Sequence, residues 1–217
     1  MSSKLFHNRK DAGEQLAVAL RKYEKEDVVV LAIPRGGLPL GYIISKELGK
    51  PLDVVLTKKI GHPFNKEYAI GAVSLESKMI SDTIDISERY IAEETARLRA
   101  LLEQRYHQYY QNIEPVNFAN KTVIIVDDGI ATGNTLIATI ELVAKKLPTK
   151  IVVAVPVAPS TALKKIKNQI KVNEVVCLHI PSRFRAVGAF YCDFSPVSDR
   201  EAITLLEKSR RNYEVGE

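Results

Sequence analysis

Five largely apolar runs recur along the chain, and each predicts a buried strand. The runs occupy residues 28–34, 52–58, 123–126, 151–157 and 174–180. Apolar residues at helical spacing predict helices around and between these runs. The predicted helices cover residues 10–24, a segment ending near Gly49, 87–110, 135–147, 161–169 and 198–211. This alternation predicts an α/β fold, with a mainly parallel sheet and helices on both of its faces.

Two segments depart from this alternation. Residues 59–69 are polar and are interrupted by Gly61 and Pro63, which predicts a flexible loop. Residues 69–81 follow with a pattern that favours a β-hairpin. Ser87 precedes the long charged helix and is expected to cap its first turn.

Composition narrows the class of protein. The 217 residues, 46% of them hydrophobic, fit a single domain covering residues 1–217. The net charge of +5 is spread along the chain, so no nucleic-acid partner is expected, although a modest positive field suits a polyanionic small substrate. Cys177 and Cys192 lack metal-site spacing, no apolar run approaches the ~20 residues of a membrane span, and the N-terminus lacks a signal-peptide pattern. We therefore expect a cytoplasmic protein with no membrane partner.

Residues that can carry chemistry follow several of the predicted strands. They are Arg35 after the first run, Lys58 and Lys59 at the end of the second, Asp127 and Asp128 after the third, and the segment from Pro181 after the last. In a parallel sheet with helices on both faces, ligands bind beyond the carboxyl ends of the strands, near a topological switch point. We expect these residues to share one site.

The stretch VIIVDDGIATGNT, residues 123–135, is the most informative of these. It combines a buried strand, two adjacent carboxylates, a flexible loop and the start of a helix. Free N–H groups at a helix start and in such a loop attract a phosphate, and carboxylates can accept hydrogen bonds from sugar hydroxyls. The residues expected to cradle the phosphate are Gly129, Ile130, Ala131, Thr132, Gly133, Asn134 and Thr135. The pattern therefore predicts a site for a phosphorylated sugar.

A second piece, PRGG at residues 34–37, directly follows the first strand. Arg35 offers a permanent cationic fork suited to a diphosphate, and Gly36 and Gly37 allow the backbone to approach a ligand closely. Taken alone, two glycines after a strand are also compatible with a simple turn. Lys58 and Lys59 are similarly compatible with solvated lysines at a strand end.

The third piece, residues 181–194, is rich in aromatic side chains although the whole chain is 7% aromatic. An aromatic ring such as that of Phe184 can stack on a flat base. A packed aromatic corner with no ligand would give the same composition, so both interpretations stay open.

Together these motifs resemble those of type I phosphoribosyltransferases, which use 5-phosphoribosyl diphosphate (PRPP). The DD pair and the ATGNT loop resemble the PRPP signature, and PRGG resembles the pyrophosphate-binding loop. The resemblance implies that Asp127 and Asp128 hold the ribose hydroxyls and that Arg35, Lys59 and Lys58 contact the diphosphate. It also implies a non-proline cis peptide bond at Pro34–Arg35.

Residues 181–194 resemble the hood of the hypoxanthine-guanine branch, and the N-terminus is expected to join this small hood. Phe184, Val187, Gly188 and Asp193 match its pattern approximately, which implies a purine-type acceptor held by Phe184 and Val187. That branch has an acid where this chain has Ala131, so no general base is identified. Overall the chain is most similar to uncharacterised bacterial and archaeal phosphoribosyltransferases of unknown acceptor.

The resemblance implies a glycosyltransferase of nucleotide metabolism that depends on Mg²⁺. The 5-phosphoribosyl group of PRPP would pass to a nitrogenous small-molecule acceptor, and pyrophosphate would leave. Asp127 and Asp128 would meet the metal through water or ribose, and Asp193 is a further candidate metal ligand. Three tyrosines on the long helix are candidates for a homodimer interface, namely Tyr106, Tyr109 and Tyr110.

Two alternatives stay open. A regulatory protein of the same fold would bind PRPP or a nucleotide without catalysis, although no helix-turn-helix pattern and no basic stripe accompany the domain here. A hydrolase or synthetase acting on phosphorylated ribose is the other, and the sequence shows no ATP-binding segment that would favour a synthetase.

Overall fold

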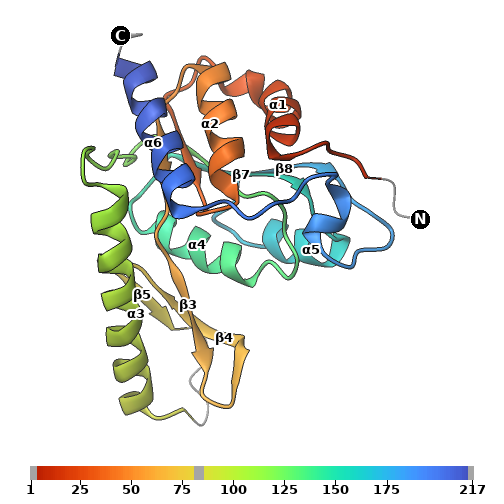
Figure 1. The fold of residues 1–217 in the computed structure, drawn as a ribbon. Helices are drawn as coiled ribbons and strands as arrows, with labels where there is room; N and C mark the ends of the chain where they lie inside the picture. Colours follow the sequence, from red (N-terminus) through yellow and green to blue (C-terminus); the bar gives the residue numbers. More distant parts are fainter. Residues whose placement is uncertain (1–3, 81–85, 215–217) are drawn as a thin grey trace.

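The computed structural model describes residues 4–80 and 86–214, and it confirms the predicted α/β class (Figure 1). Its centre is a five-stranded parallel sheet with the strand order β2-β1-β6-β7-β8. The strands are β1 Val28–Ala32, β2 Leu52–Val54, β6 Thr122–Val126, β7 Lys150–Val157 and β8 Glu174–His179. The next strand of this sheet after β1 is β2, on one side of β1, and the later strands β6, β7 and β8 follow on its other side. The topological switch point therefore lies between β1 and β6.

Helices cover both faces of this sheet because side chains alternate along each strand. Val28 and Val30 join the core under α1 (Arg9–Leu20), α2 (Gly37–Leu48) and α6 (Asp199–Glu214). Val29 and Leu31 join the opposite core under α4 (Asn134–Ala144) and α5 (Ser160–Lys167). Two 3₁₀ turns complete this part of the chain, η1 (Arg21–Tyr23) and η2 (Val187–Phe190).

A second, antiparallel sheet projects from the main body together with α3, as Figure 1 shows. Its strands are β3 Lys58–His62, β4 Asn65–Val73 and β5 Lys78–Ile80, and α3 covers Glu88–Tyr109. Ser87 accepts a hydrogen bond from the Tyr90 N–H, which confirms the predicted cap of α3. No helix of the described ranges has the length and apolarity that a membrane span requires.

The loop predicted over residues 59–69 is wrong, because β3 and most of β4 occupy this segment as a hairpin. Ile60 and Ile70 are fully buried, and they pack with Leu98 and Leu102 of α3. The sequence interpretation relied on the polar residues and on Gly61 and Pro63. In the structure, burial of one face of the hairpin against α3 stabilises the strands. The hairpin predicted over 69–81 is present as β4 and β5, up to Ile80.

Asp53 of β2 connects the main sheet to the segment that follows α3 and to the C-terminal helix α6. Its carboxylate is 3% exposed and accepts hydrogen bonds from the Tyr110 hydroxyl at 2.6 Å and the Val116 N–H at 2.6 Å. Arg210 of α6 lies 3.4 Å away. Burial raises the pKa of Asp53, and these partners oppose that rise. One buried carboxylate therefore ties β2, the segment after α3, and α6 together.

Asp53→Asn should destabilise the protein by about 3 kcal/mol, because removing one partner of a buried ion pair leaves the other charge uncompensated. The measurement is chemical denaturation at neutral pH. Asp27→Asn is the matched control, since Asp27 pairs with Lys121 on the surface with 69% of its side chain exposed, and it should cost less than about 1 kcal/mol. Equal losses in the two variants would contradict the role of Asp53.

Candidate functional site

The loop after β1 and the loop after β6 meet at the switch point, as the sequence predicted. A Cβ atom added to Gly37 would lie 2.5 Å from the Val126 carbonyl oxygen, and one added to Gly36 would lie 2.1 Å from Asp128 Oδ2. These two glycines therefore allow the first loop to pack directly against the end of β6. The sequence interpretation had assigned their small size to the approach of a ligand.

Residues 129–135 form the turn that leads into α4. Gly133 has a φ of 82° and precedes the helix as its N-cap, and no side chain caps the first turn. Thr132 and Thr135 are exposed beside this turn. Helix α2 likewise starts after Gly36 without a side-chain cap. The start of α4 thus presents backbone N–H groups where the sequence places a phosphate, whereas at α2 the Gly37 and Leu38 N–H groups already donate to the carbonyl oxygens of Ile33 and Arg35.

Asp127 and Asp128 lie side by side at the end of β6, and both are largely shielded from solvent. Asp127 Oδ1 accepts a hydrogen bond from the Asp128 N–H at 2.9 Å. Burial and the adjacent Asp128 charge hold the pKa of Asp127 well above its ordinary value.

Arg9 of α1 holds Asp128, and sequence reasoning missed this residue. Its Nε donates to Asp128 Oδ2 at 2.8 Å, and its Nη1 donates to the Ser195 carbonyl oxygen at 2.8 Å. The guanidinium lies over the Phe194 ring, 3.9 Å from its centroid. Both side chains of the ion pair are less than 15% exposed. Nothing in the N-terminal sequence distinguishes Arg9 from Lys10, its neighbour, so only the fold identifies it.

Arg35 also has an internal partner that the sequence did not indicate. Its NH1 lies 3.6 Å from Asp199 Oδ2, at the first residue of α6. The Pro34–Arg35 peptide bond is cis, as the family resemblance implied. Both arginines that reach this region are therefore next to carboxylates of the chain itself.

The two lysines of β3 point to opposite faces of their sheet, because successive strand residues alternate. Lys58 shares its face with Ile60, which packs on α3. Lys59 is opposite Ala72, which packs with Ala138 and Leu142 on α4. The predicted pair is therefore divided, with Lys58 toward α3 and Lys59 toward the helix that begins at the phosphate loop.

The N-terminus and residues 181–194 come together as expected for a hood. Phe6 pairs with Tyr191 in a parallel bridge, and the Leu5 N–H donates to the Phe190 carbonyl oxygen at 2.8 Å. Two further contacts anchor this hood to the site. The Tyr191 hydroxyl donates to the Asp128 carbonyl oxygen at 2.7 Å. Val187 lies so close to Gly129 that an added Cβ there would be 2.5 Å from Val187 Cγ1.

Phe184 is half-buried and stacks on Phe190, with ring centroids 5.6 Å apart. One face of its ring is thereby used within the hood. Asp193 is exposed, and its carboxylate accepts hydrogen bonds from the N–H and hydroxyl groups of Ser195. Those bonds lower the pKa of Asp193. The structure therefore directs this carboxylate to its own turn, not to Asp127 and Asp128.

All three candidate interface tyrosines make contacts within the chain, and the Tyr106 ring lies with its centroid 4.7 Å from that of Tyr110. Tyr109 is 1% exposed in the main core, and the Tyr110 hydroxyl donates to Asp53. Among the described residues there is no cluster of three or more His, Cys, Asp or Glu side chains that could hold a metal ion.

Asp127→Asn should raise the stability of the protein at neutral pH by roughly 1 kcal/mol. The folded-state pKa of Asp127 lies above its unfolded value, so its charge destabilises the fold at high pH and this cost disappears as the pH falls toward about 4. Thermal unfolding of both proteins between pH 4 and 8 measures the difference, which should shrink on acidification.

Asp128→Asn provides the opposite control at the adjacent position. Burial also raises the pKa of Asp128, but the Arg9 charge opposes that rise. Asp128→Asn leaves the shielded Arg9 without a charged partner, so it should lower stability by about 2 kcal/mol at neutral pH. A loss of stability of the same size in both variants would contradict the assigned difference between the two carboxylates.

Comparison with known proteins places this geometry in a family. Residues 2–194 match the family described as "Phosphoribosyl transferase domain". The chain is 34% identical over 215 residues to the "Putative phosphoribosyl transferase" of Mycobacterium tuberculosis H37Rv, a match that covers 97% of this chain and 48% of that protein. The chain thus spans about half the length of the curated relatives it matches.

Solved structures show the same architecture. The crystal structure of the TT1426 protein from Thermus thermophilus superposes with a TM-score of 0.86 at 37% identity, covering 94% of this chain and 98% of that one. The AQ2163 protein of Aquifex aeolicus, at 17% identity and a TM-score of 0.51, shares the fold over 83% of this chain and 78% of its own. With the family match spanning both site loops and the hood, the chain belongs to the phosphoribosyl transferase domain family.

Proposed function

We propose that this domain transfers the 5-phosphoribosyl group of PRPP to a nitrogenous acceptor and releases pyrophosphate. The observation that carries the proposal is the contact of the loop after β1 with the Asp127–Asp128 pair, from which residues 129–133 lead into the uncapped start of α4. The start of α4 suits the 5-phosphate, the loop with Arg35 suits the diphosphate, and the acidic pair suits the ribose.

In this arrangement residues 129–135 bind the 5-phosphate through backbone N–H groups and the hydroxyls of Thr132 and Thr135. Asp127 accepts a hydrogen bond from a ribose hydroxyl with the oxygen that the Asp128 N–H leaves free. Asp128 fixes Arg9 and the hood, and it contributes to ribose binding mainly through that support. The hydroxyls are thereby held in one orientation relative to the leaving group.

The reaction forms a bond between the acceptor nitrogen and ribose C1 and breaks the bond from C1 to the diphosphate oxygen. The bonding pair leaves with the diphosphate, so negative charge grows there while C1 becomes cation-like. Arg35, Lys58 and Lys59 stabilise that charge, and the acceptor nitrogen gives up its proton to water. The domain otherwise contributes positioning, and no covalent enzyme intermediate is required.

Mg²⁺ fits this donor set as an ion held mainly by substrate. It typically binds through one or two carboxylates, several waters and substrate phosphates. Asp127 is the suitable carboxylate, through water or the ribose, whereas Asp128 is engaged by Arg9 and Asp193 by Ser195. When bound, the ion would neutralise part of the diphosphate charge.

The acceptor is proposed to be a purine-type base. Val187 lies against Gly129 at the start of the phosphate loop, and Phe184 borders it in the hood with one ring face on Phe190. A flat base can pack against such a surface. A cytoplasmic location and a homodimer remain predictions from the sequence.

A non-catalytic role as a PRPP or nucleotide sensor is the second candidate. The observation that favours it is Ala131, which is exposed in the loop where the hypoxanthine-guanine branch has an acid. A binder needs no general base, so the absence of an acid at this position is what a sensor would show.

The decisive experiment incubates the protein with PRPP, Mg²⁺ and a panel of purines, pyrimidines and amines, and measures release of pyrophosphate. Acceptor-dependent release would support transfer. Tight PRPP binding with no release from any acceptor would favour the sensor, and absence of PRPP binding would contradict both.

Arg35→Ala should lower the rate of pyrophosphate release ~10²–10³-fold, while affinity for the nucleotide product falls much less. The reason is that Arg35 stabilises charge that develops on the leaving diphosphate, which the product lacks. Steady-state kinetics and titration with the nucleotide measure the two effects. Arg21→Ala, an exposed arginine of η1, is the matched control and should change neither. Equal losses of rate and product affinity would make Arg35 a scaffold residue.

A further inference from the structure

Helix α3 carries a charged residue within its buried stripe. Ile91, Thr95, Leu98, Leu102 and Tyr109 are its buried residues, and they follow one another at helical spacings of three and four, with one gap of seven. Arg105 fills that gap, so it lies on the same stripe as its neighbours. It is half-buried there. Arg105 therefore faces β3 and the main body, at a position that is ordinarily apolar.

The groups around Arg105 are mostly cationic. Lys58 is half-buried on the face of β3 that packs against α3. Burial lowers the pKa of Lys58, and the charges of Arg105 and Arg97 lower it further. Arg97 is neutralised by Glu94 at 2.8 Å, whereas Lys58 and Arg105 have no hydrogen bond or ion pair with any described residue. Two partly desolvated cations thus lie together without an anion.

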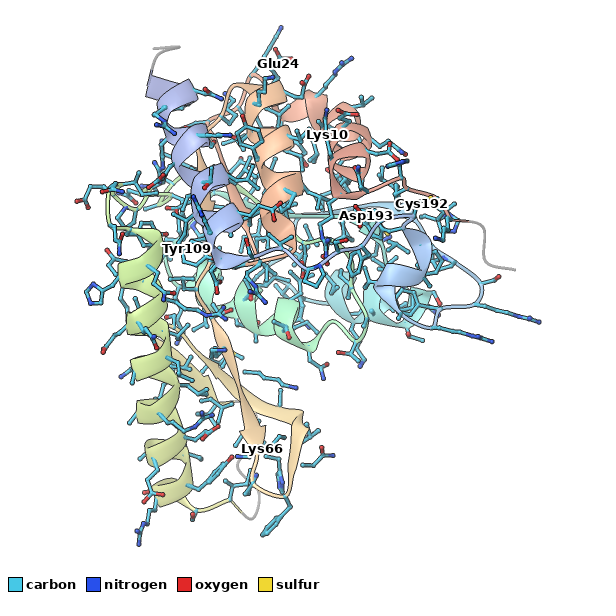
Figure 2. All side chains as sticks on the ribbon, viewed as in Figure 1. Lys10, Glu24, Lys66, Tyr109, Cys192 and Asp193 are labelled. Atoms are coloured by element: carbon cyan, nitrogen blue, oxygen red, sulfur yellow. The ribbon has the colours of Figure 1, made fainter. Side chains whose placement is uncertain are left out.

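Tyr109 extends this cluster toward the pyrophosphate loop. Its side chain is 1% exposed, and its hydroxyl has no hydrogen-bond partner among the described residues. Burial raises the pKa of Tyr109 to about 12, with the Asp199 charge raising it and the Arg105 and Arg35 charges lowering it. Figure 2 shows Tyr109 where the end of α3 approaches α6. A buried donor without a partner requires an explanation in a folded protein.

Asp199 is the carboxylate that reaches this cluster. It lies 3.6 Å from Arg35, and its other oxygen, Oδ1, is buried without a hydrogen-bond partner in the described parts of the chain. Asp199 lies beyond residues 2–194, the part that matches the family. Asp199 thus pairs with Arg35, whereas Lys58 and Arg105 have no carboxylate partner among the described residues, which leaves an excess of positive charge.

We propose that Arg105 and Tyr109 form the α3 side of the diphosphate subsite, opposite Arg35 and Lys58, and that Asp199 is an internal counter-ion that the diphosphate displaces. This inference rests on the proposed function and assigns its diphosphate-binding residues. A diphosphate supplies the negative charge that Lys58 and Arg105 lack and accepts the hydrogen bond that Tyr109 does not otherwise make. Release of Asp199 from Arg35 then accompanies substrate binding.

Arg105→Ala should weaken binding of inorganic pyrophosphate in the presence of Mg²⁺ by tenfold to a hundredfold, about the range for a hydrogen bond to a charged group. Affinity for ribose 5-phosphate should stay unchanged, because that ligand lacks the diphosphate. Tyr109→Phe should weaken pyrophosphate binding by roughly fivefold without lowering the melting temperature, since it removes only an unpartnered hydroxyl. Both affinities are measured by calorimetric titration.

Arg89→Ala is the matched control for Arg105, because Arg89 is on the same helix with 88% of its side chain exposed. It should leave both affinities unchanged. Pyrophosphate affinity in Arg105→Ala equal to that of Arg89→Ala would overturn the inference while leaving the proposed function intact. Wild-type protein that binds ribose 5-phosphate but not pyrophosphate would also overturn it, and failure to bind PRPP would contradict the proposed function itself.

Asp199→Asn should tighten pyrophosphate binding by roughly threefold or more, because it removes a carboxylate that competes for Arg35. A gain in affinity is diagnostic, since damage to the fold would weaken binding. Glu201→Gln is the control, as Glu201 lies in the same first turn of α6 and is exposed. Weaker or unchanged binding in Asp199→Asn, relative to Glu201→Gln, would overturn the role of Asp199.

Discussion

The close approach of the loop after β1 to the end of β6 governs the geometry of the whole site. Gly36 and Gly37 leave no room for a Cβ atom between this loop and the atoms of Val126 and Asp128. That contact brings the loop with Arg35 against the acidic pair, from which the turn into α4 continues. Larger residues at these positions would separate the two loops, so the spacing of the proposed phosphate and diphosphate sites depends on it.

Two pairs of opposite charges add to this contact between the loops. Arg9 pairs with Asp128, and Asp199 lies beside Arg35, so two of the motif charges are each next to one from outside the motifs. The first pair is shielded and bridges α1, the hood and β6, whereas the second is about half exposed. A shielded pair is expensive to break, and an exposed one is weak. The hood is therefore held firmly, while Arg35 remains available to an incoming anion.

The projecting unit of α3 and the small sheet shows where sequence reasoning reached its limit. The long helix and its Ser87 cap were predicted correctly because both depend on local spacing and capping. The hairpin over 59–69 was interpreted as a loop, because its stability comes from packing Ile60 and Ile70 on a helix distant in sequence. The same packing turns Lys58 and Arg105 toward one another, which no local pattern indicates.

The sequence by itself determined the α/β class, the strand ends that carry the motifs, and the family, because apolar periodicity and the DD–ATGNT stretch are local in the chain. Only the tertiary structure revealed Arg9, Asp199 and Arg105 as members of the site. Each lies on a helix whose sequence looks like an ordinary charged surface. Their roles depend on which neighbours shield them from water, and packing between segments distant in the sequence decides this. Arg9 with Asp128 and Arg35 with Asp199 are two such pairs, each more than 40 residues apart.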